Sequence, residues 1–126
     1  MSFVDDKTLR ELSRMSPEQI DTLDFGVVRV DDYGRVEVYN EYETRFANIS
    51  PQTAMGKNFF TQIAPCTNNR LIYGRFKEGV ENDEMDISVR YTFTYKMRPT
   101  LVSIRLYRDP ETHANFVLVK RVGTPQ

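Results

Sequence analysis

The strict alternation of residues 87–97 constrains the fold of this chain more than any other feature. Large apolar or aromatic side chains stand at every second position, and polar side chains stand between them. The large residues are Ile87, Val89, Tyr91, Phe93, Tyr95 and Met97. Because successive side chains of a strand point to opposite faces, this period of two predicts a strand with one buried, aromatic face. Pro99 ends the strand.

Other segments also favour strands. Residues 27–30 and 36–39 flank the turn 31–34, which is rich in Asp and Gly and indicates a hairpin. Residues 101–108 and 115–121 are joined by a turn that contains Pro110. Together with residues 87–97, these segments predict a five-stranded antiparallel sheet.

Short helices are expected between the strands. Residues 40–46 favour a helix capped by Asn40, and a further helix can begin at Ser50 and end at Gly56. Residues 71–80 are the best helical candidate, because their apolar side chains are spaced for one face.

The N-terminal segment is expected to form a partly separate helical cap. Ser16, Pro17 and Gln19 form a capping box with proline at the first helical position. We therefore predict one α+β domain of 126 residues. Residues 1–22 form the cap, 23–122 the core and 123–126 a frayed tail.

Charge and composition exclude several functions. Seventeen basic and eighteen acidic residues give a formal charge of −1, so no global field attracts nucleic acid or anionic lipid. No apolar stretch approaches the length of a membrane span, and residues 2–7 lack the layout of a secretory signal. A single cysteine fits the reducing cytoplasm. We expect a cytoplasmic monomer that binds neither nucleic acid nor membrane.

Cys66 is the only cysteine and lies between an aromatic segment and a polar loop. A lone thiol forms no internal disulfide, so its special chemistry is covalent attachment or nucleophilic attack. Taken alone, it is more often a small buried apolar side chain. His113 is the only histidine, which makes a metal site a poor interpretation. A Cys66–His113 dyad would define an enzyme, but nothing in the sequence brings that loop to the cysteine, so we expect no enzyme.

Tyr39 and Glu43 form a second candidate pair. A separation of four places them on one face if the helix begins near Tyr39. On spacing alone, a tyrosine at a strand end and a solvent-exposed glutamate is the simpler interpretation.

Longer motifs follow one another along nearly the whole chain and are far more specific. They include Leu23-Asp24-Phe25-Gly26, Tyr39-Asn40, Gly56-Lys57-Asn58-Phe59-Phe60, Ala64-Pro65-Cys66-Thr67, Tyr73-Gly74, Phe76-Lys77-Glu78-Gly79-Val80, Tyr91-Thr92-Phe93 and Val119-Lys120-Arg121-Val122. On these residues the chain resembles the photoactive yellow protein family.

The resemblance implies a PAS-type fold, with helices on one side of the sheet and the N-terminal cap on the other. It also implies a covalent chromophore, p-coumaric (4-hydroxycinnamic) acid, held as a thioester on Cys66. In that family, residues matching Tyr39 and Glu43 hydrogen-bond the phenolate oxygen, and the amide of the cysteine meets the chromophore carbonyl.

The residues that match the lining of the chromophore pocket are Phe59, Phe93, Tyr95 and Met97. Val28 is given no role in the pocket.

The function implied by the resemblance is that of a bacterial blue-light photoreceptor. After photoisomerisation, Glu43 gives its proton to the chromophore, and the buried carboxylate left behind drives partial unfolding and release of the cap. The downstream signalling protein is unknown. The sequence leaves one alternative open, a PAS-type module that binds a ligand or protein without photochemistry.

Two positions depart from the best-known family members. Ala47 stands where they carry a threonine that hydrogen-bonds the site tyrosine, and Ile49 stands where they carry an arginine that screens the pocket. We therefore expect a shifted absorption maximum or an altered cycle rate, while chromophore attachment is retained.

Overall fold

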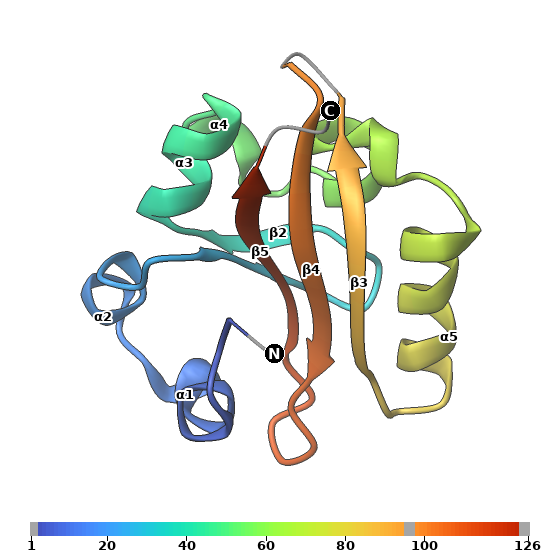
Figure 1. Cartoon of the computed structure of the whole chain (residues 1–126). Coiled ribbons are helices and arrows are strands. Elements are labelled where there is room, and N and C mark those ends of the chain that lie inside the picture. The colour runs from blue at the N-terminus through green and yellow to red at the C-terminus, as the bar shows by residue number, and fades with distance from the viewer. Residues whose placement is uncertain (1–2, 95–97, 124–126) are drawn as a thin grey trace.

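An antiparallel sheet of five strands organises the computed structural model, which describes residues 3–94 and 98–123. The strands lie in the order β2-β1-β5-β4-β3 (Figure 1). Their bounds are Gly26–Val30 for β1, Val36–Tyr39 for β2, Asp86–Phe93 for β3, Thr100–Arg108 for β4 and Asn115–Gly123 for β5. The predicted α+β, PAS-like fold is confirmed.

The strand predicted from the period of two is β3, but its apolar face is less buried than expected. Phe93 is buried, whereas Ile87, Val89 and Tyr91 are half-buried. The reason is its position at the edge of the sheet, where it pairs with β4 alone. The predicted continuation through Tyr95 to Met97 lies outside the described residues.

The helices between β2 and β3 are short and cover one face of the sheet (Figure 1). They are α3 (Glu41–Ala47), α4 (Pro51–Ala54), the π-helical turns η2 (Phe59–Ile63) and η4 (Arg70–Gly74), the 3₁₀ turn η3 (Pro65–Thr67) and α5 (Arg75–Glu81). Asn40 and Ser50 cap α3 and α4 as predicted. The predicted helix 71–80 is present, but its first turn is the π-helical η4.

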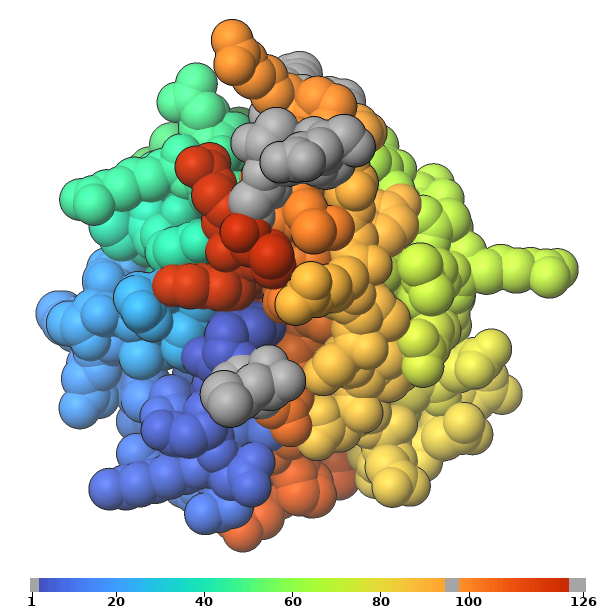
Figure 2. Space-filling view, viewed as in Figure 1, coloured from blue at the N-terminus to red at the C-terminus, as the bar shows by residue number. Residues whose placement is uncertain are grey.

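The N-terminal segment covers the opposite face of the sheet. It contains α1 (Asp6–Glu11), the 3₁₀ turn η1 (Leu12–Arg14) and α2 (Pro17–Asp21). The predicted capping box at Ser16 is formed. Leu9, Leu12 and Ile20 belong to a buried cluster that also holds Phe116 and Leu118 of β5. Figure 2 shows this segment lying against β4 and β5 on the viewed face. Its action as a separable cap stays a prediction.

Polar contacts also connect the N-terminal segment to the rest of the chain. The Ser13 hydroxyl donates to Asp109 Oδ2 at 2.8 Å. The backbone amide of Glu41 donates to Asp21 Oδ1 at 2.8 Å.

No helix among the described residues is long and apolar enough to cross a membrane.

Candidate functional site

Glu43 lies in the first turn of α3 and is almost completely buried, with 1% of its surface exposed. The cap of α3 explains its position. Asn40 Oδ1 accepts hydrogen bonds from the amides of Glu43 (3.2 Å) and Val27 (2.9 Å), which fixes the start of the helix against β1. The solvent-exposed glutamate favoured by spacing alone is therefore wrong, because the side chain points into the protein.

Gly26, the first residue of β1, provides the space for the Glu43 carboxyl group. A Cβ atom on Gly26 would lie 2.1 Å from Glu43 Oε1, which no side chain tolerates. Sequence reasoning named Gly26 only as the last residue of the motif Leu23-Asp24-Phe25-Gly26 and missed this role. The available signal was a glycine at the beginning of a buried strand, which often marks a close approach by another group.

Tyr39 ends β2 and is 4% exposed, as expected for a tyrosine at the end of a strand. Its hydroxyl group and Glu43 Oε1 are both buried, and neither has a hydrogen-bond partner in the part of the chain that the structure describes. A buried polar atom without a partner costs about 1–3 kcal/mol. The two atoms therefore suit a ligand that brings a polar group to them.

Burial also controls the protonation of this pair. It raises the pKa of Glu43 from 4.5 to about 8, so the carboxyl group is mostly protonated at neutral pH. Burial, and to a lesser extent the charge that Glu43 can carry, raises the pKa of Tyr39 above its ordinary value. Both groups can therefore donate a proton in a hydrogen bond at pH 7.

Cys66 lies in η3, directly after Pro65, and its side chain is half-buried. It packs against the cluster of buried residues to which Tyr39, Phe59 and Phe93 belong. We call this set the main cluster; it also contains residues of α4, η2, η4, α5 and every strand. The structure thus brings the cysteine and the tyrosine to one apolar interior. Glu43 is also buried, and its carboxyl group lies against Gly26 of β1.

The structure describes two of the four predicted pocket residues, Phe59 and Phe93. Phe59 and Phe93 are 1% and 3% exposed and belong to the main cluster. Tyr95 and Met97 lie outside the described residues. Sequence reasoning did not select Phe46 of α3, whose ring centre is 5.8 Å from that of Phe93.

Position 28 lies beside the site without carrying any of its polar groups. Val28 lies in β1, is completely buried in the main cluster and pairs with Tyr39 in the β1–β2 ladder. Its aliphatic side chain has no donor or acceptor, so it contributes apolar packing next to the strand end that presents Tyr39.

Two further residues that sequence reasoning did not assign to the site contact the backbone of Cys66. The Tyr91 hydroxyl donates to the Cys66 carbonyl oxygen. Asn69 Nδ2 donates to the same oxygen at 3.1 Å. In the sequence, Tyr91 stood out as a member of an aromatic strand face and of the motif Tyr91-Thr92-Phe93, and nothing local connects it to position 66.

The two positions that depart from the family pattern lie at the end of α3 and just beyond it. Ala47 is the last residue of α3 and is half-buried. Ile49 packs its side chain against the main cluster, so an apolar contact stands at this position.

His113 contacts Asp83, and its Nδ1 lies 2.9 Å from Asp83 Oδ1. Its side chain is 53% exposed, which agrees with the expected loop histidine. The described residues include no hydrogen bond between His113 and Cys66, and no group of three His, Cys, Asp or Glu side chains placed to hold a metal ion.

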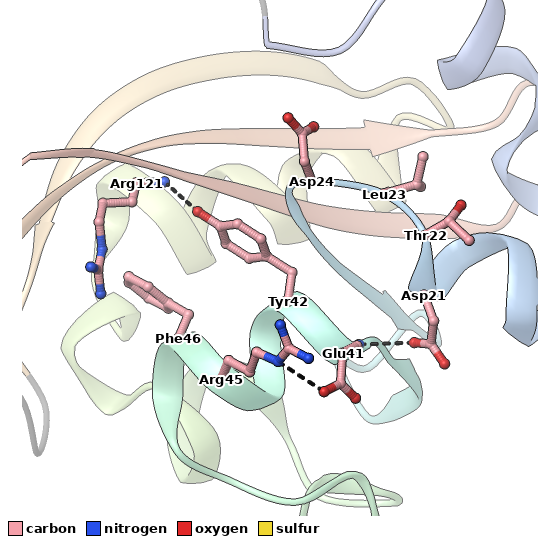
Figure 3. A pocket seen from close by; sticks show the side chains of 9 residues that line it. All are labelled: Asp21, Thr22, Leu23, Asp24, Glu41, Tyr42, Arg45, Phe46 and Arg121. Atoms are coloured by element: carbon pink, nitrogen blue, oxygen red, sulfur yellow. Dashed lines mark hydrogen bonds and ion pairs between the residues drawn. The ribbon is translucent and has the colours of Figure 1, made fainter.

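A separate pocket of about 580 Å³ lies beside α3 (Figure 3). Its lining residues are Asp21, Thr22, Leu23, Asp24, Glu41, Tyr42, Arg45, Phe46 and Arg121. Charged side chains of both signs line it, and the Tyr42 hydroxyl accepts a hydrogen bond from the Arg121 amide at 3.0 Å. Cys66, Tyr39 and Glu43 are not among its lining residues. The buried pair is the better candidate site, because Tyr39 and Glu43 present buried polar atoms that have no hydrogen-bond partner among the described residues.

The fold is that of a PAS-type domain. The family description "PAS fold" matches residues 15–119. The chain is also similar to a solved photoactive yellow protein domain from the sensor histidine kinase Ppr of Rhodospirillum centenum. That similarity has a TM-score of 0.82 and 32% identity, and covers 87% of this chain and 96% of that domain.

Curated relatives narrow the class. Photoactive yellow protein of Rhodothalassium salexigens is 38% identical over 97% of this chain and 98% of the relative. The photoactive yellow protein of Halochromatium salexigens is 35% identical over 95% and 96% of the two chains. The chain therefore belongs to the photoactive yellow protein family, whose members are PAS-type photosensory proteins.

Proposed function

We propose that this protein is a blue-light photoreceptor that carries p-coumaric acid as a thioester on Cys66. One observation carries the proposal above all others. The Tyr39 hydroxyl and Glu43 Oε1 are buried polar atoms without hydrogen-bond partners among the described residues. Tyr39 belongs to the main cluster, and the only thiol of the chain packs against the same cluster.

Attachment requires an activated form of the acid, such as an anhydride or thioester. The Cys66 sulfur attacks the acyl carbon, and the new C–S bond replaces the bond to the leaving group, which departs with the electron pair. The thiol proton passes to solvent. The backbone amide of Cys66 has no hydrogen-bond acceptor among the described residues, so it can donate to the thioester carbonyl.

Tyr39 and Glu43 would stabilise a phenolate in the pocket. A free phenol has a pKa near 10, so lowering it by roughly three units requires about 4 kcal/mol. Burial opposes this. Hydrogen bonds to a charged group contribute roughly 1.5–3 kcal/mol each, so two donors supply about 3–6 kcal/mol. Two donors therefore supply about as much free energy as the shift of the phenol pKa itself requires, before the opposing effect of burial.

The bound p-coumaroyl group would supply light absorption and a double bond that isomerises. Glu43 would hold its proton in the dark and release it after light. The resulting carboxylate would stand at a position that is 1% exposed, where a charge without partners is strongly unfavourable. Local unfolding would relieve this cost by admitting water, and would release the cap toward a signalling partner.

The rest of the site would enclose the chromophore. Phe59 and Phe93, which are buried in the main cluster, are proposed as its apolar walls, and Tyr95 and Met97 are proposed as further lining residues. We also propose that the protein acts as a cytoplasmic monomer and is not an enzyme.

The decisive experiment adds activated p-coumaric acid to the purified apoprotein and records an absorption spectrum and an intact mass. We expect one added coumaroyl group and a band in the blue that bleaches in light and recovers in darkness. The Cys66→Ala variant should gain no mass. An adduct with only a near-ultraviolet band would show that no phenolate is held, and would favour a PAS module without photochemistry. Repeated turnover of a fluorogenic thioester, in place of a single acylation, would indicate an enzyme.

A further inference from the structure

The carbonyl group of Cys66 is held by two hydrogen bonds from side chains. Its oxygen accepts from the Tyr91 hydroxyl and from Asn69 Nδ2. Asn69 Nδ2 also lies 2.7 Å from the Tyr91 hydroxyl oxygen. An amide nitrogen has two protons and a phenol has one, so the three contacts can form at the same time.

The orientation of the Asn69 amide is fixed independently. Its Oδ1 accepts a hydrogen bond from the Ile72 amide at 3.0 Å and thereby caps η4. Because the oxygen serves the cap, the nitrogen must face Cys66 and Tyr91. The residue that begins η4 therefore also donates to the carbonyl group of the cysteine.

The residues next to Cys66 are held as well. Ala64 O accepts from the Thr67 amide at 2.8 Å and from the Thr67 hydroxyl at 2.7 Å. Thr67 is completely buried. With both flanks held, the Cα–Cβ bond of Cys66 has little freedom to change direction.

Tyr91 connects this segment to the edge of the sheet. It pairs with Val102 in the β3–β4 ladder. Its ring centre is 6.2 Å from that of Phe93, with the two rings nearly perpendicular. A side chain anchored in the sheet thus reaches the cysteine backbone and borders the buried aromatic residues.

We propose that Tyr91 and Asn69 are positioning residues for Cys66: they direct its thiol toward the buried Tyr39 and restrict access of water and solutes to the sulfur. Neither residue acts on the acyl group itself. In so far as it concerns acylation, this inference rests on the proposed function. The expected effect of Tyr91 and Asn69 on the free thiol does not depend on the proposed function.

The test compares four proteins: wild type, Tyr91→Phe, Asn69→Asp and the control Tyr33→Phe. Tyr91→Phe keeps the ring and removes the donor. Asn69→Asp keeps an oxygen that can cap η4 and removes the nitrogen donor. Tyr33 is 72% exposed, and its substitution removes an equivalent hydroxyl away from the cysteine.

The first readout is the rate at which an aromatic disulfide reagent modifies the thiol of the apoprotein. The second is the rate of acylation by activated p-coumaric acid, and the third is the rate at which hydroxylamine cleaves the thioester. Loss of one neutral hydrogen bond corresponds to a change of about two- to tenfold in a coupled equilibrium. We expect thiol modification and thioester cleavage to become faster by such a factor in both site variants. Acylation should become slower, and Tyr33→Phe should behave as wild type.

The outcomes separate the two proposals. If wild type takes up no coumaroyl group but thiol modification is faster in both site variants, the proposed function fails and the positioning role stands. If wild type is acylated and both site variants match it in all three rates, the positioning role is overturned and the proposed function stands. Circular dichroism of each variant identifies a general loss of fold, and hydrogen exchange at Ile72 shows whether the η4 cap persists in Asn69→Asp.

Discussion

Replacing Glu43 by glutamine should remove most of the pH dependence of stability of the apoprotein near neutral pH. Burial raises the pKa of Glu43 from 4.5 to about 8 in the folded protein. Below pH 4.5, both the folded and the unfolded states hold the proton, and the full contribution to stability is present. As the pH rises, the unfolded state ionises first, so stability falls until the folded state also loses its proton near pH 8.

The magnitude follows from the pKa difference. Each unit contributes about 1.36 kcal/mol, so the free energy of unfolding of wild type should fall by about 2–3 kcal/mol between about pH 5.5 and 7.5. Glutamine has no proton to lose, so the variant should show a much smaller slope. The free energies of unfolding of the two proteins should also differ by an amount that does not depend on pH, because the new amide has its own hydrogen-bonding needs.

Urea denaturation at several pH values across this range measures the two slopes. Hydrogen bonds, chiefly from Arg108, lower the pKa values of Asp32 and Asp83, so these carboxyl groups titrate below the range. All other titratable groups are common to the two proteins, so the difference between the slopes reports on position 43. Parallel slopes for wild type and Glu43→Gln would refute the assignment of Glu43 as a buried, protonated acid.

Three further predictions concern the residues around Glu43. Gly26→Ala should destabilise the protein by about 1–3 kcal/mol and reduce its pH slope, because the new methyl group displaces the carboxyl group; urea denaturation at two pH values that finds neither change contradicts the close approach. Asn40→Ala should cost at least about 2 kcal/mol, since it removes the cap of α3 and leaves buried backbone groups unpaired; a loss below about 0.5 kcal/mol in the same assay would count against this. Ala47→Thr, which introduces the hydroxyl that the family resemblance associates with Tyr39, should move the absorption maximum of the loaded protein, and an identical spectrum would show that position 47 does not tune it.

The sheet and the caps could be predicted because their causes are local. A period of two in residues 87–97 requires only a strand with two different faces. Asn40 and Ser16 cap helices through atoms at most three residues away. The half-buried state of β3 was not predictable in this way, because it depends on the place of the strand in the sheet order. The π-helical form of η4 likewise follows from a bond between the Gly74 amide and the Asn69 carbonyl, which apolar periodicity does not report.

The candidate site could be predicted only through family resemblance. Spacing alone indicated an exposed Glu43, because the burial of this side chain depends on Gly26, which lies on a different element. The contact between Tyr91 and Cys66 joins residues 25 positions apart. A pattern within one segment carries no information about a partner that arrives from another.

The two ends of the candidate site are connected to opposite edges of the sheet. This arrangement suggests how ionisation of Glu43 could affect the rest of the protein. Tyr39 lies on the edge strand β2, whereas the carbonyl oxygen of Cys66 accepts a hydrogen bond from Tyr91 of the other edge strand, β3. A ligand attached to Cys66 and hydrogen-bonded by Tyr39 and Glu43 would therefore bridge the apolar interior between the edges.

The Glu43 end has a direct connection to the N-terminal segment. Asn40 Oδ1 accepts from the Glu43 amide, while its Nδ2 donates to the carbonyl oxygens of Ile20 (3.2 Å) and Phe25 (3.0 Å). Movement of α3 that admits water to an ionised Glu43 would strain these bonds together, because they share one rigid amide. The end of α2 would then lose its partner at the moment the charge forms. If the proposed function holds, the cap would respond to the protonation of Glu43 through Asn40. The proposed positioning of Cys66 by Tyr91 and Asn69 would keep the other end of the ligand fixed.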